Sequence, residues 1–303
     1  MEMKQINSHC YYFHSAVNIG YVHNGDDGMI IDAGIDKSAI KKVIKGLKQH
    51  GLPITHLFIT HAHADHYGGA MYLQDNFDVR TIAPKFETAI LENPSLEPLY
   101  LFGGNDPLDE LRNKFLEGPP VRIDDQVWEG SFTFGTFDLE TYLLPGHSYH
   151  QLAVKVFDVL YAADSYFEAG QLEKHKIPYI TDAALTIESL ERLKEIPCDG
   201  AVPGHGMYET EFKTTVQKNI DYHVVLLTWL ENYIGEHPNG VSHENLIAAM
   251  CDSFGVENKQ LGQWLLYRTA VTAYLIGAVK EETISYAIEG NRWVFKQTEK
   301  GED

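Results

Sequence analysis

Residues 60–66 read Thr-His-Ala-His-Ala-Asp-His and place four potential metal ligands in six positions: His61, His63, Asp65 and His66. On a helix, His61 and His63 would point about 200° apart. We therefore expect a loop that leaves a buried strand at 57–59 and directs alternate side chains to two cations. Imidazole and carboxylate ligands without a thiolate suit Zn²⁺, with Mn²⁺ or Fe²⁺ as alternatives. Two such cations, about 3.5–4 Å apart, can share a hydroxide and orient it as a nucleophile.

A histidine cluster can also be a tag or a solvated surface feature. A tag is homopolymeric and terminal, whereas this cluster is mixed, internal and directly follows the apolar run Leu57-Phe58-Ile59. Three histidines and an aspartate buried there without partners would be costly. We therefore interpret the motif as a metal site.

Three later segments each carry one further ligand at the end of a predicted strand: Pro145-Gly146-His147, Leu160-Tyr161-Ala162-Ala163-Asp164 and Pro203-Gly204-His205. Together with the T-H-x-H-x-D-H motif, and in this order, they resemble the metallo-β-lactamase superfamily over residues 1 to about 210. The resemblance implies a dinuclear metal-dependent hydrolase that binds two Zn²⁺, or Mn²⁺ or Fe²⁺ in their place.

The resemblance also implies a role for each ligand. The first metal is expected on His61, His63 and His147, the second on Asp65, His66 and His205, with Asp164 bridging both. Asp65 is also the expected catalytic residue, which orients the nucleophile or relays its proton. Asp32, in Ile31-Asp32-Ala33-Gly34, matches a family aspartate that supports the ligand loop by holding an imidazole N–H. The alternative for Asp32 is an ordinary turn residue.

Two ligand positions narrow the expected reaction. The namesake β-lactamases lack a bridging aspartate where this chain has Asp164, and flavo-diiron proteins carry glutamate where it has His63. The resemblance therefore predicts a metal-bound hydroxide that cleaves an ester, thioester or lactone of a small molecule. A phosphodiesterase or ribonuclease of the same superfamily is the alternative enzyme. A non-catalytic regulator that senses a ligand is the alternative from another class, and the complete ligand set argues against it.

Four other side chains stand near these motifs. His150 could reach the site but is expected at a strand edge, because a lone histidine is usually structural or solvated. Tyr166 resembles in placement a tyrosine used by lactonases, one residue out of register, and is expected in the core. Ser148 and Ser165 lie beside ligands, but neither has the G-x-S-x-G context of a nucleophile, so no serine mechanism is predicted.

The elements that must position the ligands predict two packed sheets with helices outside them. The resemblance implies the corresponding α+β fold, the αββα metallo-β-lactamase sandwich, over residues 1–207. A hairpin at 21–32 and a helix capped by Asp36 precede the ligand strand. Residues 86–125 show no clean period and are interpreted as an insertion, partly helical around 108–116, that is either a lid or decoration. Strands at 152–157 and 159–163 are expected to pair antiparallel.

Residues 208–303 form a second predicted domain. A long helix from Phe212, a helix capped by Ser242, a third helix over 259–276 and a hairpin over 283–295 follow the order of a winged-helix domain. This domain has eight lysines and arginines and fourteen acidic residues. Its cations are too few to neutralise the phosphates that a protein contacts on a nucleic-acid duplex. We interpret this domain as a packing module that covers the metal site or mediates homodimerisation.

Composition agrees with a small-molecule enzyme. The net charge of −19 repels phosphodiester backbones, which argues against a nucleic-acid partner. No apolar stretch approaches the roughly 18 residues that span a bilayer, and the start lacks a secretory signal. Cys10, Cys198 and Cys251 are widely separated and predicted to be buried hydrophobes, which fits a reducing cytoplasm.

Overall fold

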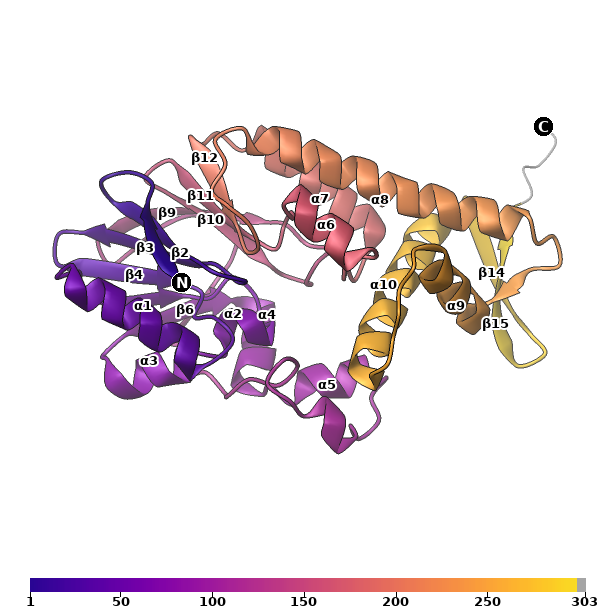
Figure 1. Cartoon of the computed structure of the whole chain (residues 1–303), viewed down its shortest axis with the longest axis horizontal. Helices are drawn as coiled ribbons and strands as arrows, with labels where there is room; N and C mark the ends of the chain where they lie inside the picture. The colour runs from indigo at the N-terminus through magenta and orange to yellow at the C-terminus, as the bar shows by residue number, and fades with distance from the viewer. Residues whose placement is uncertain (299–303) are drawn as a thin grey trace.

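The computed structural model describes residues 1–298 and contains two facing sheets with helices outside them, joined to a helical region (Figure 1). The first sheet has seven strands in the order β1-β2-β3-β4-β5-β6-β7 and the second has five in the order β12-β11-β10-β9-β8. The first comprises β1 (Glu2–Gln5), β2 (Cys10–His14), β3 (Ile19–Asn24), β4 (Asp27–Ile31), β5 (His56–Phe58), β6 (Arg80–Pro84) and β7 (Asp125–Val127). The second comprises β8 (Gly130–Phe134), β9 (Phe137–Leu143), β10 (Leu152–Val156), β11 (Val159–Ala163) and β12 (Gly200–Pro203).

The first sheet changes from antiparallel to parallel at β4. Strands β1 to β4 are joined by tight turns, including the predicted hairpin, whereas β4, β5, β6 and β7 are parallel and need crossovers. The crossovers from β4 to β5 and from β5 to β6 contain α1 (Lys37–Gln49), α2 (Ala64–Tyr67) and α3 (Ala70–Asn76), and the insertion forms the crossover from β6 to β7. Helix α1 begins where predicted, because the Asp36 carboxylate accepts hydrogen bonds from the Ser38 and Ala39 amides.

Three buried clusters separate four layers and confirm the αββα sandwich. One cluster lies between α1, α3 and the first sheet, a second between the two sheets, and a third between the second sheet and the helices α7 (Ala183–Glu195) and α8 (Phe212–Gly235). The alternation along each strand divides side chains between layers. Val154 packs between the sheets while its neighbour Ala153 packs toward the helices. The predicted pairing of β10 with β11 is confirmed as antiparallel.

The predicted partial helicity around 108–116 is confirmed only as one short turn. The helices of the insertion come earlier, as α4 (Lys85–Glu92) and α5 (Leu96–Leu101), and only a single 3-10 turn, η1 (Asp109–Leu111), occurs in the predicted range. Residues Leu111 and Leu116 are instead buried against Leu265, in a cluster between the insertion and the C-terminal region. That long-range contact determines the local backbone, and no short-range pattern indicates it.

The C-terminal region has the predicted order of helices and hairpin. After α6 (Ala169–His175) and α7, it comprises α8, β13 (Val241–Ser242), α9 (His243–Ser253), α10 (Leu261–Lys280), β14 (Ile284–Glu289) and β15 (Arg292–Gln297), with a sheet in the order β13-β15-β14. Helix α8 serves two cores, because Val216 packs on the sandwich and Leu230 packs on the C-terminal helices. Helix α10 packs against α7, α8 and α9 and also touches α5 and η1. It therefore runs from α8 to the insertion (Figure 1).

Two further expectations concern the cysteines and membrane helices. All three cysteines are free, and Cys10 and Cys251 are buried as predicted, whereas Cys198 is only half-buried at the end of α7. Within residues 1–298, no helix combines the length and the apolar character needed to cross a bilayer.

Candidate metal centre

Every predicted ligand follows the end of a strand. The histidines His61 and His63 lie in the loop after β5, His147 in the loop after β9, and Asp164 directly after β11. His205 follows β12, which is parallel to β11, so the parallel register brings Asp164 and His205 to the same edge. The motif is not all loop, however, because Asp65 and His66 lie on the short helix α2. The helical turn keeps His66 beside the first histidine, because the ring centroids of His61 and His66 are 4.2 Å apart.

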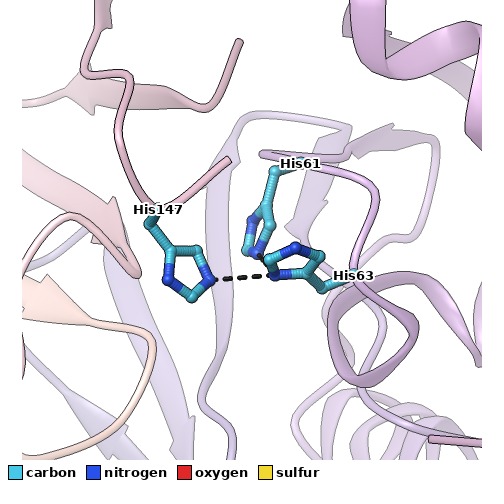
Figure 2. A group of neighbouring side chains, drawn as sticks. All are labelled: His61, His63 and His147. Atoms are coloured by element: carbon cyan, nitrogen blue, oxygen red, sulfur yellow. Dashed lines mark hydrogen bonds between the residues drawn. The ribbon is translucent and has the colours of Figure 1, made fainter. Parts of the chain in front are cut away.

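Three histidines from two loops converge on one point (Figure 2). The Nδ1 atom of His63 lies 3.1 Å from Nε2 of His61 and 2.9 Å from Nε2 of His147. One nitrogen of each ring thus points to a common centre, as Zn²⁺ coordination by three imidazoles requires. These are the three residues assigned to the first metal.

The remaining ligands form a second group around Asp164. Its Oδ1 lies 3.3 Å from Nε2 of His66, and its Oδ2 lies 3.3 Å from Nε2 of both His147 and His205. The Asp65 Oδ2 is 3.6 Å from Nε2 of His205. The Asp164 carboxylate therefore reaches histidines of both groups, which is the position that a bridging ligand needs. The structure brings all seven predicted ligands into these groups.

The nitrogens that face away from the centre are held by other groups. Nδ1 of His66 is 2.8 Å from Oδ2 of Asp32, whose carboxylate also accepts hydrogen bonds from the backbone and hydroxyl of Thr60. The Nδ1 atoms of His147 and His205 lie within hydrogen-bond distance of the carbonyl oxygens of Tyr179 and Ala16. Such partners select the tautomer in which Nε2 is free to bind a metal. Asp32 thus occupies the supporting position predicted for it, rather than being an ordinary turn residue.

The backbone at the site is tightly constrained. Asp32, which holds His66, has a φ of 62°, and Ala163, which precedes Asp164, has a φ of 49°. Positive φ values are unusual for residues with a side chain. Gly204 has no room for a side chain, because a Cβ there would lie 1.9 Å from Oδ1 of Asp164. The glycine before His205 therefore allows the two parallel strands to place their ligands side by side.

The electrostatics of the ligands divide them into two sets. Burial lowers the pKa of His63 to about 4 and that of His147 to about 3, and it lowers the pKa of His61 well below its usual value. Burial opposes charge on His66 and His205 as well, but the nearby Asp164 raises the pKa of both. The first set is therefore held as neutral imidazole, the form that binds a metal.

The residues present fit a pair of metal ions. The atoms His66 Nε2 and Asp164 Oδ1 are fully buried, point at each other and have no hydrogen-bond partner among residues 1–298. Burying such polar atoms without a partner is costly, and a cation between them removes that cost. The donor set of five imidazoles and two carboxylates suits Zn²⁺, Mn²⁺ or Fe²⁺.

One important residue was missed by sequence reasoning. Glu87, on α4, is buried; its Oε2 accepts from the Ala62 amide at 3.0 Å, and its Oε1 accepts from the His150 amide at 2.9 Å and from the Ser148 hydroxyl. It thereby joins the loop that carries His61 and His63 to the loop that carries His147. The available signal was its place just after β6, since the ends of neighbouring parallel strands meet at one edge.

The other residues considered near the motifs do not join the metal ligands. The His150 ring stacks on Phe86, away from the cluster. The hydroxyl of Ser148 donates to Glu87, and that of Ser165 donates to the Ala162 carbonyl at 2.6 Å, so both are engaged structurally. Tyr166 is buried beside Phe212 in the core between the second sheet and α8, as predicted.

A cavity of about 590 Å³ opens beside the first metal group. Its walls include Ala62 and His63 from the ligand loop, residues of α4 and α5 from the insertion, and residues of α10. The volume is typical of a small-molecule pocket. The insertion and the C-terminal helix thus both border the predicted site.

Comparison with known proteins agrees with this geometry. The family model of the metallo-beta-lactamase superfamily matches residues 13–205, more than half of the chain. A hydroxyacylglutathione hydrolase of Rhodopseudomonas palustris (strain BisB18) is 31% identical over 186 residues, which is 60% of this chain and 59% of that protein. The match thus spans less than two thirds of that relative. The probable metallo-hydrolase YqgX of Bacillus subtilis (strain 168) is 27% identical over 205 residues, 67% of this chain and 90% of that protein.

Solved structures extend the likeness to the C-terminal region. A beta-lactamase domain protein from Burkholderia ambifaria aligns with a TM-score of 0.76 and 19% identity, over 98% of this chain and 94% of that one. A metallo-beta-lactamase family protein from Thermus thermophilus aligns with a TM-score of 0.71 and 15% identity, over 93% of each chain. At these identities the likeness shows the fold. With the match of the family model, it establishes that the chain belongs to the metallo-β-lactamase superfamily.

Proposed function

We propose that the chain is a dinuclear metal-dependent hydrolase that cleaves an ester, thioester or lactone of a small molecule. The observation that carries this proposal is the Asp164 carboxylate, whose two oxygens lie 3.3 Å from histidines of both ligand groups. A site that held one metal would not need a carboxylate in that position. The family and the relatives named as hydrolases support the same reaction class.

Two bound metals, most simply Zn²⁺, would supply a nucleophile from water at neutral pH and polarise the carbonyl of the substrate. The chain's own residues hold the ligands and handle the proton. Asp65 is the ligand carboxylate that remains partly open, with 31% of its side chain exposed, whereas Asp164 is 5% exposed. Asp65 is therefore the group placed to accept a proton from the reacting centre and to pass it to solvent.

The cavity favours an uncharged reacting group over a phosphodiester. Its walls are mostly apolar, with Arg268 as the one lysine or arginine among the lining residues. Helix α10, the element that would enter a groove in a winged-helix DNA complex, is packed against α7 and touches α5. With a net charge of −19, the chain also repels a polyanion. The ribonuclease or phosphodiesterase alternative therefore ranks second.

The proposed hydrolase is tested by metal analysis and a substrate panel. Protein loaded with Zn²⁺ or Mn²⁺ should bind two metals per chain and hydrolyse at least one thioester, ester or lactone, whereas phosphodiesters and RNA should be untouched. Asp164→Ala should lose one metal and most of the activity. A single tightly bound metal, or RNA cleavage without carbonyl hydrolysis, would contradict the proposal.

The setting of the enzyme is also a proposal. Three free cysteines in the described part of the chain fit a reducing compartment such as the cytoplasm. Homodimerisation through the C-terminal domain stays a prediction, which light scattering on the purified chain would check.

A further inference from the structure

The cavity beside His63 has one wall that comes from the C-terminal domain. Five residues of α10 line it: Arg268, Thr269, Thr272, Ala273 and Ile276. Arg268, Thr272 and Ile276 are four residues apart, as are Thr269 and Ala273, so all five lie on a single face of the helix. This face of α10 therefore borders the same cavity as His63.

The opposite wall is apolar. Ala89 of α4 and Leu96 and Leu99 of α5 line it, and both leucines are more than a third exposed. Exposed leucines that gather around one cavity mark a binding surface rather than a core. An apolar chain placed there would cover them and displace poorly held water.

The cavity wall contains a positively charged side chain, although the chain as a whole is strongly acidic. Arg268 is the one lysine or arginine among the lining residues, and 38% of its side chain is exposed. Among residues 1–298, its ion-pair partner is Glu244, whose carboxylate lies 3.7 Å from the guanidinium Nε. That distance is too long for a good hydrogen bond, so the planar fork of the guanidinium is available to a ligand anion. By contrast, the Glu87 carboxylate in the wall is already occupied by three donors.

We propose that the substrate carries an apolar arm that lies between α5 and α10 and ends in an anion bound by Arg268. The inference rests on the proposed function, because it places the scissile carbonyl at the metal centre next to His63. The arm belongs either to the acyl group or to the leaving group of the substrate, since an apolar chain that ends in an anion would make the same contacts with this cavity in both cases. The C-terminal domain is thus a specificity element of the hydrolase.

The first test concerns the apolar arm. Thioesters of one thiol with acetyl and octanoyl groups, and thioacetates of a short and a long alkyl thiol, separate the acyl side from the leaving-group side. One of the two long-arm substrates should have a kcat/KM at least tenfold above its short counterpart. Ala89→Phe should abolish that preference by filling the cavity. Ala248→Phe is the matched control, because Ala248 is also an exposed helical alanine but lies on α9, away from this cavity. Equal rates for long and short arms on both sides would overturn the proposal.

The second test concerns the anion. A carboxylate is placed at the end of the preferred arm, as in suberoyl compared with octanoyl. Arg268→Gln should lower the ratio of kcat/KM for the carboxylate arm to the methyl arm by about tenfold, which is the loss of one charge-assisted contact. Glu244→Gln should raise the same ratio, because it removes the competing carboxylate. A ratio unchanged in both variants would show that Arg268 does not bind the anion.

The two proposals fail in different ways. Calorimetric titration of the metal-loaded protein with suberate needs no hydrolysis. Suppose that no ester or thioester is cleaved, but that suberate binds and its binding is weakened by Ala89→Phe and by Arg268→Gln. The cavity assignment then stands and the proposed reaction is wrong. If acetyl thioesters are cleaved without any preference for an arm, the reaction stands and the cavity assignment is wrong.

Discussion

Replacing Glu87 by glutamine tests whether a residue outside the ligand set holds the two ligand loops together. The carboxylate accepts from the Ala62 amide with one oxygen and from the His150 amide and the Ser148 hydroxyl with the other. Glutamine has nearly the same shape but replaces one acceptor by an NH₂ donor. Whichever way the amide turns, at least one buried N–H faces another donor.

The expected loss follows from these contacts. A hydrogen bond to a charged acceptor contributes roughly 1.5–3 kcal/mol, and a buried donor left without a partner costs about 1–3 kcal/mol. If the amide oxygen stays with the two donors near His147, the loop between His61 and His63 loses its contact. We therefore expect Glu87→Gln to lower the free energy of unfolding by about 2 kcal/mol. Because the partners of ligand loops typically contribute about 10- to 100-fold to metal affinity, the first metal should bind more weakly by that factor.

The assay is a metal competition titration with a chromogenic chelator, combined with chemical denaturation of the metal-free protein. Glu92→Gln is the control, because Glu92 lies on the same helix but is exposed. It should match the wild type in both measurements. If Glu87→Gln also keeps wild-type metal affinity and stability, the hydrogen bonds of Glu87 do not position the ligand loops and the reasoning is refuted.

Three further predictions concern the site. Gly204→Ala should lose the proposed second metal and most activity, because its Cβ would lie 1.9 Å from Oδ1 of Asp164. Gly170→Ala, where a Cβ meets nothing within 4 Å, should keep both, and elemental analysis decides. On acidification the second metal should leave first, because His66 and His205 have a raised pKa in the absence of metal and so bind competing protons at higher pH than the first-site histidines. The measurement is the metal content after dialysis across a pH series. Loss of the first-site metal at the higher pH would contradict this prediction. Ser165→Ala should keep activity within about tenfold, or roughly 1.4 kcal/mol, because its hydroxyl is engaged in the core; an acyl adduct on this serine in a mass spectrum would speak for a serine nucleophile.

Much of the site was predictable because its ligands are local to strand ends. Four ligands fall within His61 to His66, and the three others each follow a short apolar run that is recognisable as a strand. The parallel pairing of β11 and β12 brings two of these strand ends together. Convergence with the ligands after β5 and β9 also required the packing of the first sheet on the second. The supporting role of Asp32 was predictable for the same reason, because it directly follows β4.

The rest depended on contacts between distant segments. Glu87 lies in a segment whose sequence shows no clean period, and its role is visible only once α4 is packed against both ligand loops. The predicted helicity around 108–116 is limited to one 3-10 turn, in a segment where Leu111 and Leu116 pack against Leu265, far along the chain. Local propensity is a weak guide where such packing decides the backbone.

The sequence by itself determined the αββα class, the candidate metal ligands and the order of the C-terminal elements, because each depends on residue type and short-range spacing. Only the tertiary structure decided what α10 does. Its place in the chain is that of the third helix in the predicted winged-helix order, and nothing within the helix tells which surface it will meet. Packing against α7 and α5 turns Arg268 and Ile276 toward the cavity beside His63. The physical reason is that local periodicity specifies which face of a helix is apolar. The surface against which that face packs depends on which apolar surfaces the rest of the folded chain leaves exposed.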